Sequence, residues 1–203
     1  MLAWAATVLE KTGGRLVSDG TITEYERARV VQLLGRTRDD FLAAVECVTD
    51  DQWCFRPIPD GWSIGLIAEH LGLVERGLFG RVEQALRGAT FPEWQTATGG
   101  KDALIQTMLA DRNTRKDAPD AVVPTGTVAR HDALQIFQER RARSLAFAET
   151  TTAPLRAYAV DHHRPTVGTL NAYQWLLYIP LHNQRHIRQI SEIKAETGYP
   201  MGM

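Results

Sequence analysis

Two histidines, His182 and His186, lie four positions apart in the stretch IPLHNQRHIRQI (residues 179–190). An α-helix turns about 100° per residue, so both side chains lie on one face. That face also carries Trp175 and Ile179, and we expect it to point into the protein. Buried imidazoles need polar partners, because an unpaired buried polar group costs about 1–3 kcal/mol. A divalent metal ion is one such partner, although the pair alone is weak evidence for a metal site.

A third histidine, His70, lies in the apolar stretch GLIAEHLGLVE (residues 65–75). A lone inward histidine is more often a hydrogen-bonded core residue than a ligand, and this alternative stays open. Three imidazoles contributed by two helices would match a catalytic zinc site, which keeps its fourth position open for water or substrate. Imidazole ligands suit zinc, nickel, copper or iron rather than magnesium or calcium, and the sequence does not select among them.

Other residues near these histidines have two interpretations each. Glu75 is a candidate catalytic residue that orients a ligand or relays a proton, and the alternative is a solvated or capping carboxylate. Gln189 is a candidate to support a ligand histidine by a hydrogen bond, and the alternative is a surface amide. Pro180 either kinks or breaks its helix, or bends it so that space opens beside His182.

The remaining histidines and the two cysteines are interpreted structurally. We expect His162 and His163 to support a loop, with the movement of one of them to the metal as an alternative, and His131 to face solvent. Cys47 and Cys54 form no CxxC pair, so unpaired and inert thiols in a reducing cytoplasm are expected.

Helical periodicity predicts the elements that position these residues. Apolar residues recur at three or four positions over four long segments, at about 23–48, 64–86, 131–149 and 170–196. A polar stretch with Gly and Pro at 88–130 is predicted to be a long crossover that contains one shorter helix, at about 101–115. The segment APLRAYAVDHHRPTVGTL (residues 153–170) is predicted to be a loop. The pattern predicts an all-α, antiparallel four-helix bundle as a single domain at 23–203, after an N-terminal extension at 1–22 that contains a short helix.

Composition excludes several classes of protein. The 203 residues carry a formal net charge of −1, so no overall attraction to nucleic acid or to an anionic membrane is expected. The apolar opening MLAWAATVLEK is a poor signal peptide and too short to span a bilayer, which predicts a cytoplasmic protein. The basic run at Arg140, Arg141 and Arg143 is interpreted as the solvated face of a helix.

Three motifs resemble the DinB/YfiT-like superfamily. GWSIGLIAEHL (residues 61–71) is similar to the start of that family's second helix, and VGTLNAYQWLLYIPLHNQRHIRQI (residues 167–190) is similar to its final helix. DHHRP (residues 161–165) resembles the loop before that helix. The resemblance covers about residues 23–196, with the first and third helices matching only in pattern. The N-terminal 20 residues and the long insert around 88–130 depart from the family's pattern, and the insert is in a position to cover or reshape the pocket.

The resemblance implies a bundle in up-down-down-up order with a divalent metal, typically zinc or nickel, held by His70, His182 and His186. Characterised relatives are thiol-dependent S-transferases and a maleylpyruvate isomerase that uses mycothiol. The leading hypothesis is therefore an S-transferase in which a low-molecular-weight thiol, activated at the metal, attacks a small-molecule electrophile in a pocket lined by Trp175 and Ile179. A metal-dependent hydrolase, and a non-enzymatic metal-binding or dimer-forming bundle with a stress-related role, are the alternatives.

Overall fold

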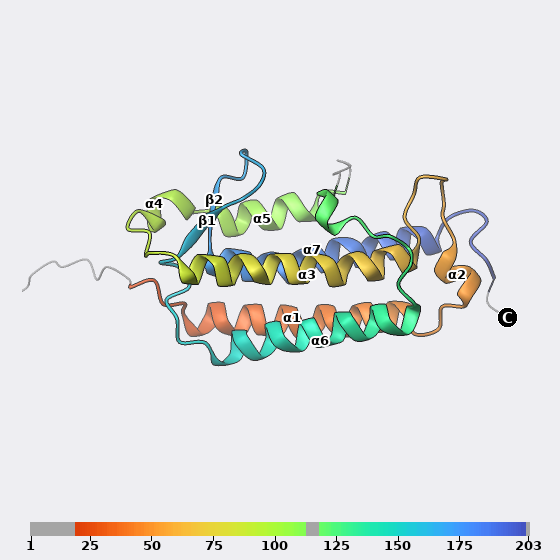
Figure 1. Cartoon of the computed structure of the whole chain (residues 1–203), viewed down its shortest axis with the longest axis horizontal. Helices are drawn as coiled ribbons and strands as arrows, with labels where there is room; N and C mark the ends of the chain where they lie inside the picture. Colours follow the sequence, from red (N-terminus) through yellow and green to blue (C-terminus); the bar gives the residue numbers. More distant parts are fainter. Residues whose placement is uncertain (1–18, 113–117, 202–203) are drawn as a thin grey trace, which may run out of the picture.

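The computed structural model describes residues 19–112 and 118–201, so most of the predicted N-terminal extension lies outside the described residues. Its four long helices are α1 (Glu24–Val45), α3 (Ile64–Arg87), α6 (Arg130–Thr150) and α7 (Ala172–Lys194). In Figure 1, α1 and α7 run in one direction along the molecule and α3 and α6 run in the other. This is the up-down-down-up order that the resemblance implied, and it confirms the predicted all-α bundle. The expectation of a fully antiparallel bundle is wrong in part, because the packed neighbours α3 and α6 are parallel, as are α1 and α7.

Each long helix packs against two others, so the bundle has a closed square section. Helix α3 contacts α6 and α7, and α1 contacts the same two helices. The chain must return along the whole bundle between α3 and α6 because these neighbours are parallel. Helix α5 (Lys101–Ala110) makes this return and lies against α7.

Local sequence signals fix where the helices begin. Thr23 and Glu26 form a reciprocal capping box at the start of α1, and Asn171 and Gln174 form another at the start of α7. The Ser63 hydroxyl accepts from the Leu66 backbone N–H at the start of α3. The helices that carry His70 and the His182–His186 pair therefore each have a defined first turn.

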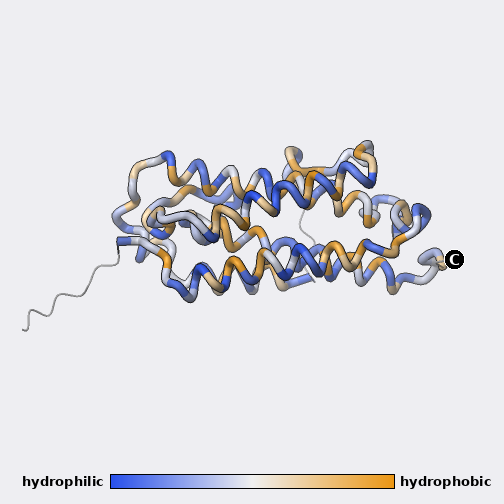
Figure 2. The backbone as a smooth tube through the Cα atoms, turned by 90° about the horizontal axis from the view of Figure 1, so that it is seen from below, coloured by the Kyte–Doolittle hydropathy of each residue, from blue (hydrophilic) through white to orange (hydrophobic). Residues whose placement is uncertain are grey.

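Apolar side chains recur along the helices between hydrophilic ones, and Figure 2 shows this alternation along the tube. They form two buried clusters, of which one contains Leu34, Val82 and Leu176 and the other contains Phe41, Ile67 and Ile190. Burial of these side chains supplies the main favourable free energy of folding.

Several short elements were not predicted. The first helix was predicted to run to residue 48, but it ends at Val45, and Thr49 caps the separate helix α2 (Asp50–Cys54). The crossover also contains α4 (Trp94–Thr98) and the 3₁₀ turn η1 (Asp120–Val122). The predicted helix at 101–115 ends at Ala110, and residues 113–117 lie outside the described chain.

The expectation that residues 153–170 form only a loop is wrong in part. Strands β1 (Ala159–Asp161) and β2 (Thr169–Asn171) pair antiparallel, with Val160 opposite Leu170. Three-residue strands are too short to show the alternation of apolar and polar residues that identifies a strand in sequence.

The interpretation of Pro180 as a break between two helices is wrong, because α7 is continuous through it.

A buried arginine joins three of the four long helices. Arg141 was expected on a solvated face, but its side chain is fully buried on α6. Its guanidinium donates to both carboxylate oxygens of Glu75 on α3, at 2.9 and 3.0 Å. On α1 it donates to the Leu34 carbonyl at 2.8 Å and to the Thr37 hydroxyl at 2.9 Å. The expectation for Arg141 is therefore wrong, whereas Arg143 is 65% exposed as expected.

We predict that Arg141→Met lowers the free energy of unfolding by about 3–5 kcal/mol, because it leaves the buried Glu75 carboxylate without its partner. The double variant Glu75→Leu/Arg141→Met should recover part of this loss, since no unpaired charge remains. Arg143→Met is the control, because its ion pair with Glu83 is exposed and is worth about 1 kcal/mol or less. Urea denaturation measures all three, and equal losses for Arg141→Met and Arg143→Met would contradict the prediction.

A second ionic cluster ties the crossover to the end of the bundle opposite α2. Arg156 donates to Glu26 on α1 and to Asp102 on α5. Burial is the largest influence on the pKa of each carboxyl and raises it. The hydrogen bonds and charge of Arg156 act against burial, with added hydrogen bonds from Thr23 to Glu26 and from Gln174 to Asp102. Both pKa values consequently lie below their ordinary values of 4.5 and 3.8.

A carboxyl group whose pKa is lowered by folding stabilises the fold above its ordinary pKa and loses that contribution as the pH falls through its folded-state pKa. We predict that Arg156→Gln destabilises the protein most above about pH 5 and progressively less below about pH 4. Arg36→Gln is the control, since Arg36 pairs with Asp40 on the surface. Denaturation curves across this pH range measure the difference, and a constant cost of Arg156→Gln at every pH would count against the prediction.

Candidate metal centre

Helix α7 brings the His182 and His186 rings together at one side of the bundle. Their ring centroids lie 4.5 Å apart, and their Nε2 atoms lie 3.3 Å apart. His186 is 6% exposed, and His182 is half-buried. The spacing of four residues therefore places both imidazoles on one face, as predicted.

Helix α3 supplies the third imidazole. His70 lies in the second turn of α3, and the antiparallel packing of α3 on α7 brings its ring centroid to 5.3 Å from that of His182 and 4.8 Å from that of His186. One ligand atom from each of the three rings can be chosen so that all lie within 4.8 Å of one another. The structure thus brings together the three histidines that the sequence analysis proposed as ligands.

Hydrogen bonds fix the protonation of two of the rings. His70 Nδ1 lies 2.7 Å from the Val122 carbonyl oxygen, which can only accept, so Nδ1 carries the hydrogen. His186 Nδ1 lies 2.8 Å from Gln189 Oε1 and donates in the same way. In both neutral rings the lone pair is therefore on Nε2, the atom that is left for a metal ion.

Burial keeps these imidazoles neutral. It is the main cause that lowers the pKa of His70 to about 4, and it lowers the pKa of His186 well below its ordinary value, with a further contribution from His70. Neutral imidazole is the form that binds metal, so at neutral pH both rings need no deprotonation before binding.

The spacing of two of the three candidate ligands fits a zinc-like ion. Two nitrogen ligands at ~2.05 Å from a tetrahedral zinc ion lie ~3.3 Å apart, which matches the separation of the His182 and His186 Nε2 atoms. Two of the three candidate ligand rings already have outer hydrogen-bond partners, an arrangement that ligand histidines in metalloproteins almost always show. Three protein ligands also leave a coordination position for water or substrate.

Two aromatic side chains flank the histidines, and the sequence analysis identified neither as part of the site. The Trp62 ring lies 4.6 Å from His70 and is stacked on His186 at 6.1 Å, and the Tyr178 ring is stacked on His182 at 6.3 Å. Tyr178 precedes His182 by four residues, and that spacing was the available signal. The contacts of Trp62 depend on the loop before α3, which no local pattern predicts.

The other predicted site residues have clear positions. Gln189 contacts His186, as proposed. Trp175 and Ile179 are each 2% exposed and belong to the bundle core, and the Trp175 ring is stacked on His162 at 5.3 Å. Glu75 is not the solvated carboxylate of one interpretation, because both its oxygens bind Arg141. The roles of Glu75, Trp175 and Ile179 in catalysis or in a substrate pocket stay predictions.

The remaining histidines and the cysteines largely match their expected positions. His162 is buried in the turn of the β1–β2 hairpin, where its Nδ1 accepts from the Arg164 backbone N–H at 3.0 Å, and it supports the loop. His131 is exposed at the start of α6. Cys47 and Cys54 are exposed and unpaired.

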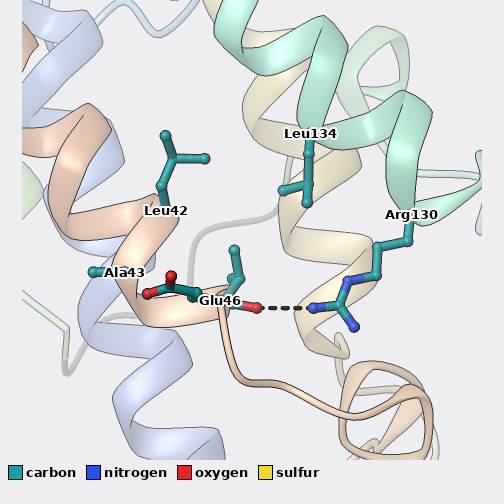
Figure 3. A pocket seen from close by; sticks show the side chains of 6 residues that line it. Leu42, Ala43, Glu46, Arg130 and Leu134 are labelled. Atoms are coloured by element: carbon teal, nitrogen blue, oxygen red, sulfur yellow. Dashed lines mark hydrogen bonds between the residues drawn. The ribbon is translucent and has the colours of Figure 1, made fainter.

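A cavity of about 360 Å³ lies elsewhere, between the end of α1 and the start of α6 (Figure 3). It is lined by Leu42, Ala43, Val45, Glu46, Arg130 and Leu134. Arg130 donates to the backbone carbonyls of Val45 and Val48, and thereby closes the end of α1. None of the proposed ligands lines this cavity, so it is separate from the histidine group.

None of the helices in the described ranges is long and apolar enough to cross a membrane.

Comparisons with known proteins show which family and which solved fold this chain resembles. The model of the DinB superfamily matches residues 33–190. The uncharacterized protein YuaE of Bacillus subtilis (strain 168) is 23% identical over 153 residues, which cover 73% of this chain and 87% of YuaE. A solved structure of YfiT from Bacillus subtilis superposes with a TM-score of 0.61 at 19% identity, and covers 88% of this chain and 91% of that chain. YfiT is described as a probable metal-dependent hydrolase with an unusual four-helix bundle topology.

We predict that His70→Ala, His182→Ala and His186→Ala each lower bound zinc or nickel from about one ion per chain to well below half, because two imidazoles bind far more weakly than three. His131→Ala, in which an exposed histidine is removed, is the matched control and should retain full occupancy. Elemental analysis after dialysis against each metal measures the occupancy. Full occupancy in any one of the three variants would remove that residue from the site.

Proposed function

Since this chain belongs to the DinB superfamily, we propose that it is a metal-dependent enzyme that transfers a low-molecular-weight thiol to a small electrophile. The observation that carries the proposal is the convergence of three imidazoles from α3 and α7, with ligand atoms within 4.8 Å of one another. His70, His182 and His186 would hold a divalent ion. Their imidazoles suit zinc, nickel, copper or iron, and the family resemblance favours zinc or nickel among these. A bound ion would lower the pKa of a thiol or water molecule at its open position, which gives a nucleophile near neutral pH.

The chain's own residues have separate tasks in this proposal. The Val122 carbonyl and Gln189 hold His70 and His186 in the tautomer that offers Nε2. Trp62 and Tyr178 cover the rings and limit the access of bulk water. Burial raises the pKa of Tyr178 above its ordinary value of 10.0, so its hydroxyl is protonated at neutral pH. Cys47 and Cys54 have no task, because they lie exposed at the edges of α2 and the thiol comes from the cosubstrate.

The proposed transfer consumes only the thiol and the electrophile. With a chloroaromatic compound, the thiolate sulfur forms the new carbon–sulfur bond, chloride leaves with the bonding electron pair, and the proton of the thiol passes to solvent. No oxidant or reductant is required.

A hydrolase is the second candidate function, and the likeness to YfiT favours it. In that case water rather than a thiol would occupy the open position and attack an ester or amide carbonyl. The bond from the carbonyl carbon to the alcohol oxygen or amine nitrogen would break, and the alcohol or amine would leave with the electron pair and a proton from the water. The two candidates share the three histidines, so they differ in the nucleophile that the site admits.

An assay with both nucleophiles tests the proposal. We predict that the zinc- or nickel-loaded protein consumes 1-chloro-2,4-dinitrobenzene in the presence of glutathione, cysteine or mycothiol at least tenfold faster than the His70→Ala variant. The His131→Ala variant should retain the full rate. Absorbance of the thioether product measures the reaction.

A parallel assay measures the release of nitrophenol from nitrophenyl esters without added thiol. Ester turnover that depends on metal and on His70, with no thiol transfer, would replace the transferase by the hydrolase. If neither reaction depends on His70, both enzymatic proposals are wrong for these substrate classes.

A further inference from the structure

The crossover contacts α3 at the turn that carries His70, and it does so mainly through one carboxylate. Glu69, the residue before His70, is 9% exposed. Its Oε1 accepts from the Thr125 backbone N–H and from the Thr125 hydroxyl, each at 2.8 Å, and its Oε2 accepts from the Gly126 N–H at 2.9 Å. A carboxylate that accepts three hydrogen bonds from one turn is a strong anchor for that turn.

The turn that Glu69 holds is close in sequence to Val122, the hydrogen-bond partner of His70. Val122, whose carbonyl accepts from His70 Nδ1, lies only three residues before Thr125. Thr125 and Gly126 are exposed, so little apolar burial holds this part of the chain in place. The position of the Val122 carbonyl therefore depends on the hydrogen bonds to Glu69.

The backbone of the turn is shaped for this contact. Gly126 has φ +76°, a backbone conformation that residues other than glycine rarely adopt. A Cβ at this position would lie 3.3 Å from Leu66 Cδ2. A glycine lets the turn approach α3 closely enough for both backbone N–H groups to reach the carboxylate.

The preceding part of the crossover is tied to the other ligand helix. Arg185, next to His186 on α7, donates to the Asp111 carbonyl, and Arg112 pairs with Glu192. The crossover is thus attached to α7 and to α3 beside their ligand histidines.

We propose that Glu69 is a positioning residue of the metal centre. By holding Thr125 and Gly126 against α3, it keeps the Val122 carbonyl in place as the acceptor for His70 Nδ1, so that His70 presents Nε2 to a divalent ion. This inference rests on the proposed metal site, and it adds a residue that touches neither the ligand atoms nor a substrate.

Two variants test the contact from opposite sides. Glu69→Gln has one acceptor oxygen instead of two and places an NH₂ group against the backbone N–H groups of the turn. Gly126→Ala strains the turn and leaves Glu69 intact. The matched controls are Glu83→Gln, which makes the same substitution at the surface of α3, and Gly77→Ala, where an added Cβ meets no atom within 4 Å.

The readouts are zinc affinity by competition with a chromogenic chelator, the visible spectrum of the cobalt-substituted protein, and histidine ring ¹⁵N NMR without metal. We expect Glu69→Gln and Gly126→Ala to weaken zinc binding by about 10–100-fold, to change the cobalt spectrum, and to weaken the His70 Nδ1–H signal. Circular dichroism at the assay temperature selects conditions in which every variant is folded. The two controls should stay within about twofold of the wild-type affinity.

Each result decides a different point. Wild-type zinc affinity and an unchanged His70 signal in Glu69→Gln would overturn the positioning role and leave the metal site intact. A weaker affinity with an unchanged cobalt spectrum and tautomer would also overturn it, because Glu69 would then act on stability alone. Failure of the wild-type chain to bind zinc, nickel or cobalt would overturn the proposed function, and the positioning role with it.

Discussion

The buried guanidinium of Arg141 is the constraint on which the arrangement of α1, α3 and α6 depends. All of its hydrogen bonds described above end on α1 or α3, and both oxygens of Glu75 are used in them. An unpaired charge at this depth would cost several kcal/mol, so a shift of any of the three helices along its axis is strongly disfavoured. Apolar side chains fill the bundle, but they tolerate small axial shifts more easily than this set of directed bonds does.

Through α3, the Arg141–Glu75 ion pair also fixes the position of the three histidines. Glu75 lies five residues after His70 on the same helix. A fixed position for Glu75 therefore also fixes the position of His70 along the bundle axis. Helix α7 then packs against α1 and α3 and brings His182 and His186 to the same position along the bundle axis. The crossover completes the arrangement by supplying the Val122 carbonyl. A structural ion pair and a candidate metal centre are therefore two parts of one alignment of helices.

Much of the fold and the gathering of the three histidines could be predicted because both depend on local periodicity. A spacing of four residues placed His182 and His186 on one face, and an apolar stripe indicated that His70 points inward. The burial of Arg141 could not be predicted, since Arg140 and Arg143 beside it suggested a solvated face and its partners lie 66 and more than 100 residues away. The same limit applies to Glu69, whose partners are 56 and 57 residues away. The strands of the hairpin were missed for another reason, because they are too short to carry a pattern.

The pairing of the first long helix with the last also determines when the protein can complete its fold during synthesis. Tyr173 at the start of α7 donates to the Glu26 carbonyl at the start of α1, and α7 also contacts α3 and α5. Until the ribosome has made α7, the helices α1, α3 and α5 expose the apolar surface that α7 later covers. The nascent chain therefore stays incomplete, and dependent on protection from aggregation, until its last long helix has emerged.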